Sequence, residues 1–260
     1  MLRLAPTIAY TLIVLVLLTG CSGTNKKQPP TSSIKLSDLV PANPVSPAKT
    51  AVFKFYTIEL PAENIDRLSD IWSMLYTKPI QLTNPRASSA NDFKFVFGEI
   101  QMWQRIAEML ESAGAALIEK NKLLLDYGQI KDFTITQINS ETKVSYITSD
   151  LTIGSLTVKS GRLVLRLSVS PIPGERGVCS FNATPALIPD IPPDANEQPQ
   201  KTEEKVFDAL AFTVEMSPSD FFLMGPESYP GTNSLGNLVF TTAQGRKIWV
   251  YTVFCIGLSE

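Results

Sequence analysis

The stretch FTITQINSETKVSYITSDLTIGSLTVKSGRLVLRLSVSPI, residues Phe133 to Ile172, decides the fold class of this chain. Runs rich in β-branched and aromatic residues, such as FTITQI, KVSYIT and RLVLRLSVSPI, follow one another at short spacing. The pairs Asn-Ser, Ser-Asp and Ser-Gly separate these runs, and such pairs favour turns. The pattern predicts an antiparallel β region, with a hairpin turn at Ser160-Gly161 that pairs Thr157-Val158 with Arg162–Val169.

Similar runs continue to the end of the chain: GVCSFNATPAL, VFDALAFTVEM, DFFLMG, NLVF and KIWVYTVFCIGL. The last of them ends close to the carboxyl terminus, so we expect it to be an internal strand of the sheet. Residues 129–260 are therefore predicted to form a predominantly antiparallel β domain.

Residues 51–128 have a different pattern, which alternates strand and helix signals. AVFKFYTIEL, from Ala51 to Leu60, predicts a strand, and apolar residues at helical spacing predict a helix over 62–76. A second amphipathic helix is predicted from Glu99 to a C-cap at Gly114, followed by two short strands around Lys120-Asn121-Lys122. The predicted fold class is α+β, with a small N-terminal α/β module of two helices before the β domain.

The first residues are typical of an exported protein. Arg3 is basic, Ile8 to Leu18 is apolar and uncharged, and small residues follow. This layout predicts a secretory signal peptide over residues 1–20. The apolar run from Ile8 to Leu18 is shorter than the about 20 residues that a membrane-spanning helix needs, so we do not expect a spanning helix. Two Pro-rich polar segments, a tether over 21–50 and a loop over 189–205, have too few large apolar residues to order themselves.

Leu18-Thr19-Gly20-Cys21 resembles the lipobox of bacterial lipoproteins, in which the cysteine becomes the lipidated first residue. The resemblance implies a membrane anchor of acyl chains, palmitate among them, on Cys21. Ser22 after the cysteine implies, by the same resemblance, an outer-membrane location facing the periplasm. The alternative is an ordinary secretory peptide in which Cys21 occurs by chance.

Composition excludes several classes of chemistry. The chain has no histidine and a formal net charge of −2, which argues against His-based catalysis, His-based metal sites and nucleic-acid binding. We expect no cofactor and no metal. Besides Cys21 the chain has two cysteines, Cys179 and Cys255. In an oxidising compartment they could form a disulfide, and as free thiols in strands they would act as small apolar side chains; both alternatives stay open.

The C-terminal half, after about Phe133, resembles the core β domain of secretins, the outer-membrane rings of type II and III secretion and of type IV pili. The segments that carry the resemblance are GRLVLRLSVSPI, SPSDFFLMGP, SLGNLVF and RKIWVYTVFCI. Pro226 stands where secretins have a second glycine, so the resemblance implies a secretin-like lipoprotein without its own pore. The motif positions are Gly161, Pro171, Gly225, Gly236 and Phe240.

Two functions follow from these observations. The first is a lipid-anchored, structural or interaction protein of the cell envelope, not an enzyme, with secretion proteins or a second copy as partners. The alternative is a carboxylate-dependent hydrolase, or a glycan-binding module, that acts on cell-wall polysaccharide. Glu63, Asp66 and Asp70 lie at helical spacing and are its candidate acids. We interpret them instead as the solvated face of a helix, where acids are favoured near the N-terminus.

Overall fold

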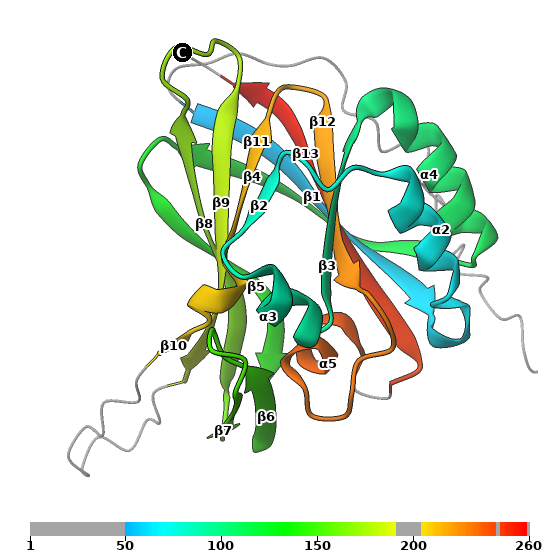
Figure 1. The fold of residues 1–260 in the computed structure, drawn as a ribbon, viewed down its shortest axis with the longest axis vertical. Helices are drawn as coiled ribbons and strands as arrows, with labels where there is room; N and C mark the ends of the chain where they lie inside the picture. The colour runs from blue at the N-terminus through cyan, green and yellow to red at the C-terminus, as the bar shows by residue number, and fades with distance from the viewer. Residues whose placement is uncertain (1–49, 191–203, 243–244, 259–260) are drawn as a thin grey trace, which may run out of the picture. The chain divides into compact units, whose positions relative to one another are not determined.

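The computed structural model describes residues 50–190, 204–242 and 245–258, and Figure 1 shows the fold. Its main feature is a 5-stranded sheet, sheet A, with the order β3-β12-β13-β1-β4. The strands of sheet A are β1 (Thr50–Pro61), β3 (Phe93–Glu99), β4 (Ala116–Asp126), β12 (Asp220–Pro226) and β13 (Lys247–Leu258). All of its strand pairs are antiparallel. The final strand β13 lies inside the sheet, between β12 and β1, as the sequence predicts.

A second sheet, sheet B, has the order β2-β11-β9-β8-β5, and β10 adds to β9. Its strands are β2 (Ile80–Leu82), β5 (Ile130–Ile138), β8 (Gly161–Pro171), β9 (Cys179–Pro189), β10 (Lys205–Val206) and β11 (Phe212–Met216). Leu163, Leu165 and Leu167 alternate with outward side chains on β8 and join Phe53 and Phe55 of β1 in one buried cluster. The sheets therefore pack face to face around a common core.

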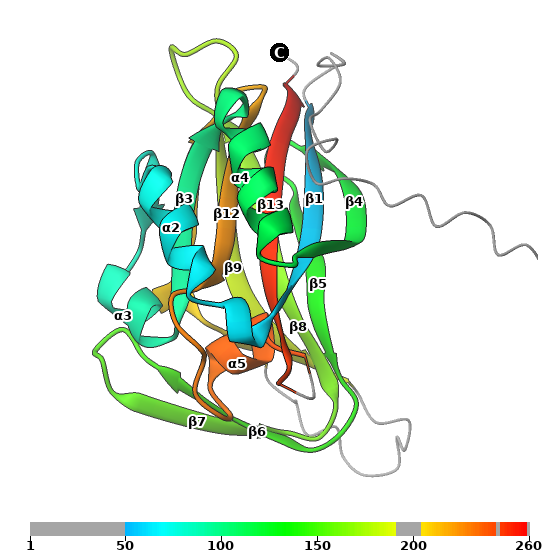
Figure 2. The ribbon, with the colours of Figure 1, turned by 90° about the vertical axis from the view of Figure 1, so that its right-hand side faces the viewer.

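Helices cover the other face of sheet A (Figure 2). They are α2 (Arg67–Met74), which follows the 3₁₀ turn η2 (Ala62–Asn64), and α4 (Ile100–Ser112). Trp103, Ile106 and Leu110 of α4 are fully buried against the side chains of sheet A that point away from sheet B. Gly114 ends α4 with φ 77°, and its N–H donates to the Glu111 carbonyl at 2.9 Å, so the predicted C-cap is confirmed.

The hairpin expected at Ser160-Gly161 is not formed. The strands β6 (Thr142–Ile147) and β7 (Ile153–Val158) pair with each other, whereas β8 pairs with β5 and β9. The residue pair Ile138–Gly161 of the β5–β8 ladder is followed by Thr142–Val158 of the β6–β7 ladder. The four strands thus form one long two-stranded ribbon, whose turn lies at 148–152. The breaks between β5 and β6 and between β7 and β8 interrupt the hydrogen-bond ladder but do not end the ribbon.

Two other local predictions were wrong. Residues 120–122 are not a turn, because β4 runs without a break through them and pairs with β1 along its length. The NLVF run is not a strand but part of helix α5 (Leu235–Phe240), where the Ser234 hydroxyl accepts from the Asn237 N–H at 3.0 Å. This side-chain cap starts the helix, and Leu235, Val239 and Phe240 bury one face.

The boundary predicted between residues 128 and 129 lies within a single compact unit. β1 and β4 from the first part share sheet A with β12 and β13 from the second part. The two parts therefore do not pack as separate modules, and the fold is mostly antiparallel β with a few helices. The remaining short helices are α3 (Pro85–Ala90) and η3 (Asp208–Leu210). None of the described helices has the length and apolar character needed to span a membrane.

Candidate interaction site at the open edge of sheet A

The outermost strands β4 and β5 leave two sheet edges open on the same side of the molecule (Figure 2). The chain passes from one sheet to the other at a turn, where Gly128 has φ 82° and donates its N–H to the Val169 carbonyl at 3.1 Å. Among the described strands, none pairs with the outer side of β4 or β5. Unpaired N–H and C=O groups on such an edge can bind another extended chain.

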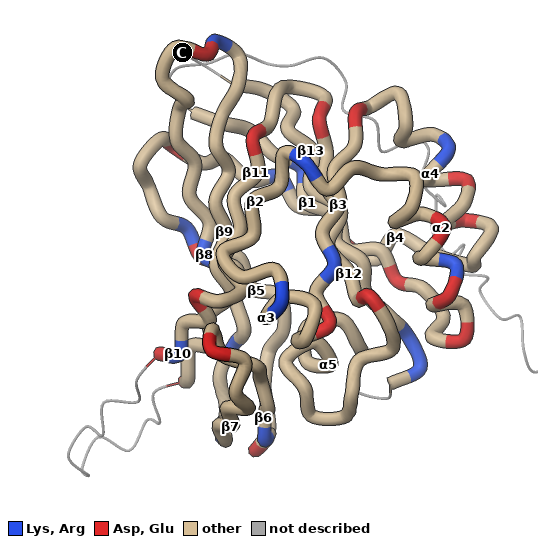
Figure 3. The backbone as a smooth tube through the Cα atoms, viewed as in Figure 1, with Lys and Arg blue, Asp and Glu red and all other residues tan. Residues whose placement is uncertain are grey.

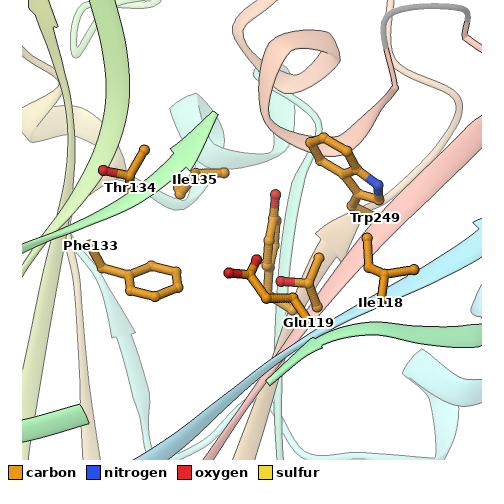
Figure 4. Close-up of a pocket in the computed structure, with 8 residues that line it drawn as sticks. Ile118, Glu119, Phe133, Thr134, Ile135 and Trp249 are labelled. Atoms are coloured by element: carbon orange, nitrogen blue, oxygen red, sulfur yellow. The ribbon is translucent and has the colours of Figure 1, made fainter. Parts of the chain in front are cut away.

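A cleft of about 60 Å³ lies between these two edges (Figure 4). Apolar and polar side chains share its walls, and Trp249 of β13 faces Phe133 and Ile135 of β5 across it. The Trp249 indole N–H is buried and has no acceptor among the described residues. The residues that line the cleft are Thr57, Ile118, Glu119, Phe133, Thr134, Ile135, Trp249 and Tyr251.

The polar side chains that line the cleft carry three hydroxyls, one carboxylate and the Trp249 indole N–H. Glu119 supplies its only lining carboxylate, which accepts a hydrogen bond from the Asn121 amide at 2.9 Å. Tyr251 is buried, and its hydroxyl donates to the Val239 carbonyl at 2.9 Å. Burial, and then the Glu119 charge, raise the pKa of the Tyr251 phenol well above its ordinary value, so the hydroxyl stays a neutral donor. One carboxylate without a second acid or base does not suffice for general acid–base hydrolysis of a glycan.

The outer face of the same edge is basic. Lys54 of β1 stands opposite Lys122 of β4, and Lys120 stands opposite the neighbouring Tyr56. Desolvation by burial lowers the pKa of Lys54, and the charges of Lys120 and Lys122 lower it further. We call Lys54, Lys120 and Lys122 the lysine cluster. It gives this part of sheet A a positive potential that would attract an acidic partner.

Exposed apolar side chains flank the lysine cluster and the cleft. Ile118 and Leu124 on β4 are 47% and 53% exposed, and Ile130 at the start of β5 is 69% exposed. Single exposed apolar residues are ordinary on protein surfaces, but these three belong to the two strands whose edges are open. The β4 edge therefore combines free backbone groups, positive charge and apolar side chains.

The predicted site residues lie elsewhere. Cys21, the tether and most of the 189–205 loop are outside the described residues. Glu63, Asp66 and Asp70 are exposed around η2 and α2, and none of them lines the cleft. Figure 3 shows acidic residues interspersed with basic ones along α2 and α4, which is the pattern of a solvated helix face. No cluster of metal-ligating side chains is present in the described part of the chain.

None of the five motif positions lines the cleft, although the Phe240 ring lies 6.2 Å from the ring of Tyr251, which does. A Cβ on Gly161 would lie 2.6 Å from the Ile188 carbonyl oxygen, so β8 and β9 approach closely there. A Cβ on Gly225 would lie 3.1 Å from the Trp72 ring, and one on Gly236 2.4 Å from the Asn91 carbonyl oxygen. Pro171 ends β8 opposite Cys179, and the Phe240 ring meets the Phe93 ring at 4.8 Å.

No protein-family model, curated protein or solved structure matches this chain. Sequence reasoning divided β4 into two short strands because it interpreted Lys120-Asn121-Lys122 as a turn. The signal was nevertheless present, since Lys120, Lys122 and Leu124 alternate with Asn121, Leu123 and Leu125 across the same strand.

Proposed function

We propose that this chain is a lipid-anchored interaction protein of the cell envelope, which binds an extended segment of a partner protein along β4. The open edge of β4 is the observation that carries the proposal. β4 has 11 residues, long enough to pair with a partner strand of ordinary length. Main-chain hydrogen bonds along such an edge provide affinity, and the alternate side chains provide specificity.

The side chains of β4 define the partner. Lys120 and Lys122 point to the outer face, so the partner strand would place acidic side chains beside them. Leu124 on the same face would pair with an apolar side chain. The opposite face of the partner strand would lie over the cleft, where Phe133 and Ile135 favour apolar residues. The partner segment is thus an amphipathic strand with one acidic and one apolar face.

The cellular setting in this proposal comes from the sequence. The LTGC motif supports lipidation of Cys21, and Ser22 supports the outer membrane facing the periplasm. The secretin-like order of segments makes a secretion or pilus assembly the favoured partner. Replacing Cys21 with Ser would test the anchor: we expect loss of acyl labelling and release of the chain from the membrane fraction.

One observation favours the alternative of a glycan-binding or hydrolytic module, since the Glu119 carboxylate lies in the same cleft as the Trp249 ring. An aromatic ring can stack on a sugar, but hydrolysis would need a second carboxylate. Binding of soluble peptidoglycan fragments that quenches tryptophan fluorescence, and that is lost in Glu119→Gln, would support this alternative over strand addition.

A photo-crosslinking residue placed in the full-length, membrane-anchored chain tests the strand-addition proposal directly. We expect position 124 on β4 to crosslink to one specific envelope protein. The matched control is position 153 on β7, where Ile153 is also an exposed apolar residue on a strand. Crosslinking from 153 but not from 124 would place the interface on the ribbon and contradict the proposal. Adjacency of the gene to secretion or pilus genes would identify the first partners to examine.

A further inference from the structure

We propose that Cys179 and Cys255 form a disulfide that joins sheet B to sheet A when the chain folds in an oxidising compartment. The proposal concerns the stability of the fold and does not depend on the function proposed for β4. In the structure both residues are free thiols.

The two cysteines come from different sheets and meet in the same core. Cys179 begins β9 of sheet B, and Cys255 lies near the end of β13 of sheet A. Both are fully buried, and both belong to the cluster between the sheets. No other cysteine lies in the described part of the chain, so each of these two thiols has a single candidate partner there.

The aromatic residues beside the cysteines show that the sheets touch here. Phe53 of β1 stands opposite Cys255 in the strand register. Phe181 follows Cys179 by two residues and points to the same face of β9. The rings of Phe53 and Phe181 meet edge to face, with centroids 4.9 Å apart. The Cys179 thiol is also the largest influence on the pKa of the Cys255 thiol, which agrees with the two side chains lying close together in the core.

The chemistry is thiol–disulfide exchange with an oxidising disulfide, such as that of a periplasmic dithiol oxidase or oxidised glutathione. One cysteine thiolate attacks a sulfur of the oxidant, which forms a mixed disulfide and expels the other sulfur as a thiolate. The second cysteine then attacks the mixed disulfide, which closes the Cys179–Cys255 bond and releases the second thiolate. The protein loses two protons and two electrons, and the oxidant is reduced to two thiols.

The bond has to form before the core closes. In the folded chain the neighbouring Cys179 thiol, and then burial, raise the pKa of the Cys255 thiol far above its ordinary value. Since the thiolate is the reacting species, exchange within the closed core is suppressed. β13 is the last strand in the sequence and the centre of sheet A, so Cys255 stays accessible until that strand docks.

Peptide mapping tests the proposal on the full chain exported to an oxidising periplasm. The protein is unfolded with an alkylating reagent present, without reductant, and digested with trypsin. We expect the peptide Gly177–Lys201 to be recovered linked to the peptide Ile248–Glu260, and to separate from it on reduction. Recovery of the two peptides unlinked, with both cysteines alkylated, would overturn the proposal.

Thermal unfolding provides a second measurement. Reductant should lower the midpoint of the exported wild-type chain by about 10 °C, because a crosslink across a long loop constrains the unfolded chain. Cys179→Ala and Cys255→Ala should each have a lower midpoint that reductant does not change, and the double variant should resemble the single ones. A wild-type midpoint that does not respond to reductant would contradict the crosslink, and it would leave the β4 proposal unaffected.

Discussion

Lys54 and Lys122 stand opposite each other on the adjacent strands β1 and β4, and the groups that perturb Lys54 include no carboxylate. Like charges in directly opposed positions of an antiparallel pair destabilise the sheet. The fold therefore tolerates a repulsion at its open edge. In the proposed complex, acidic side chains of the partner would relieve that repulsion.

Lys122→Gln should make the isolated protein more stable and the proposed complex weaker. Removing the repulsion should raise the free energy of unfolding by about 0.2–1 kcal/mol, and the gain should shrink at high salt. Urea unfolding at low and high ionic strength measures this effect. Lys143→Gln is the control, because Lys143 on β6 stands opposite Thr157. A loss of stability in Lys122→Gln would show that the lysine cluster is not strained.

Leu124→Asp should abolish capture of the partner and leave the fold intact. The side chain is 53% exposed, so we expect stability to change by no more than about 0.5 kcal/mol. The new carboxylate would repel an acidic partner strand and would remove an apolar contact. Ile153→Asp on β7 is the matched control and should bind normally. Equal binding by both variants, measured by pull-down from solubilised membranes, would show that β4 is not the interface.

Gly161→Ala should destabilise the protein strongly. The backbone of Gly161 has φ 159°, and a Cβ would lie 2.6 Å from the Ile188 carbonyl oxygen across the β8–β9 ladder. Overpacking against backbone should cost about 1–3 kcal/mol. Gly231→Ala is the control, because a Cβ there meets nothing within 4 Å. Chemical denaturation of both variants measures the difference, and similar midpoints would contradict the close approach seen here.

Asp220→Asn should remove part of the pH dependence of stability. Burial raises the pKa of Asp220 above its ordinary value of 3.8, as does Glu99 on the opposed strand, although a hydrogen bond from the Ser217 N–H at 2.7 Å opposes this. The folded state thus prefers the protonated acid. The stability contributed by this group is present below pH 3.8 and is lost as the pH rises through the folded-state pKa.

The asparagine variant stays neutral and can still accept the Ser217 hydrogen bond. We therefore expect the free energy of unfolding of Asp220→Asn to rise relative to wild type as the pH increases from 4 towards neutrality (~7). Urea unfolding across this range gives the comparison. A difference between the two proteins that stays constant with pH would show that Asp220 titrates normally in the fold.

Tyr251→Phe should cost more than Tyr229→Phe, although both remove a hydrogen bond from a phenol to a carbonyl. Tyr251 is buried and donates to Val239, whereas Tyr229 is 47% exposed and donates to Gly245. The Val239 carbonyl would lose a buried partner, which costs about 1–3 kcal/mol, while water can replace the partner of Gly245. Equal losses of stability in Tyr251→Phe and Tyr229→Phe, measured by thermal or urea unfolding, would argue against a water-free core beneath the cleft.

Local patterns in the sequence were sufficient to predict those helices and strands that are stabilised mainly by their own residues. The alternation of Ala51–Leu60 and the apolar spacing after Glu99 predicted β1 and α4, and Gly114 predicted the end of that helix. These signals are strong because burial on one face imposes a period on the chain. NLVF failed as a strand because the Ser234 cap and the burial of Phe240 stabilise a short helix instead.

Long-range pairing was decided only by the tertiary structure. Nothing local indicates that β1 lies between β13 and β4, or that β7 pairs with β6 and not with β8, because strand order depends on contacts between distant residues. The same pairing leaves the β4 edge open and brings Cys179 against Cys255 from opposite sheets. The sequence by itself thus determined that the chain is rich in β strands, and it contains the LTGC motif on which the proposed location rests. The packing of the two sheets determined where a partner or a disulfide could form.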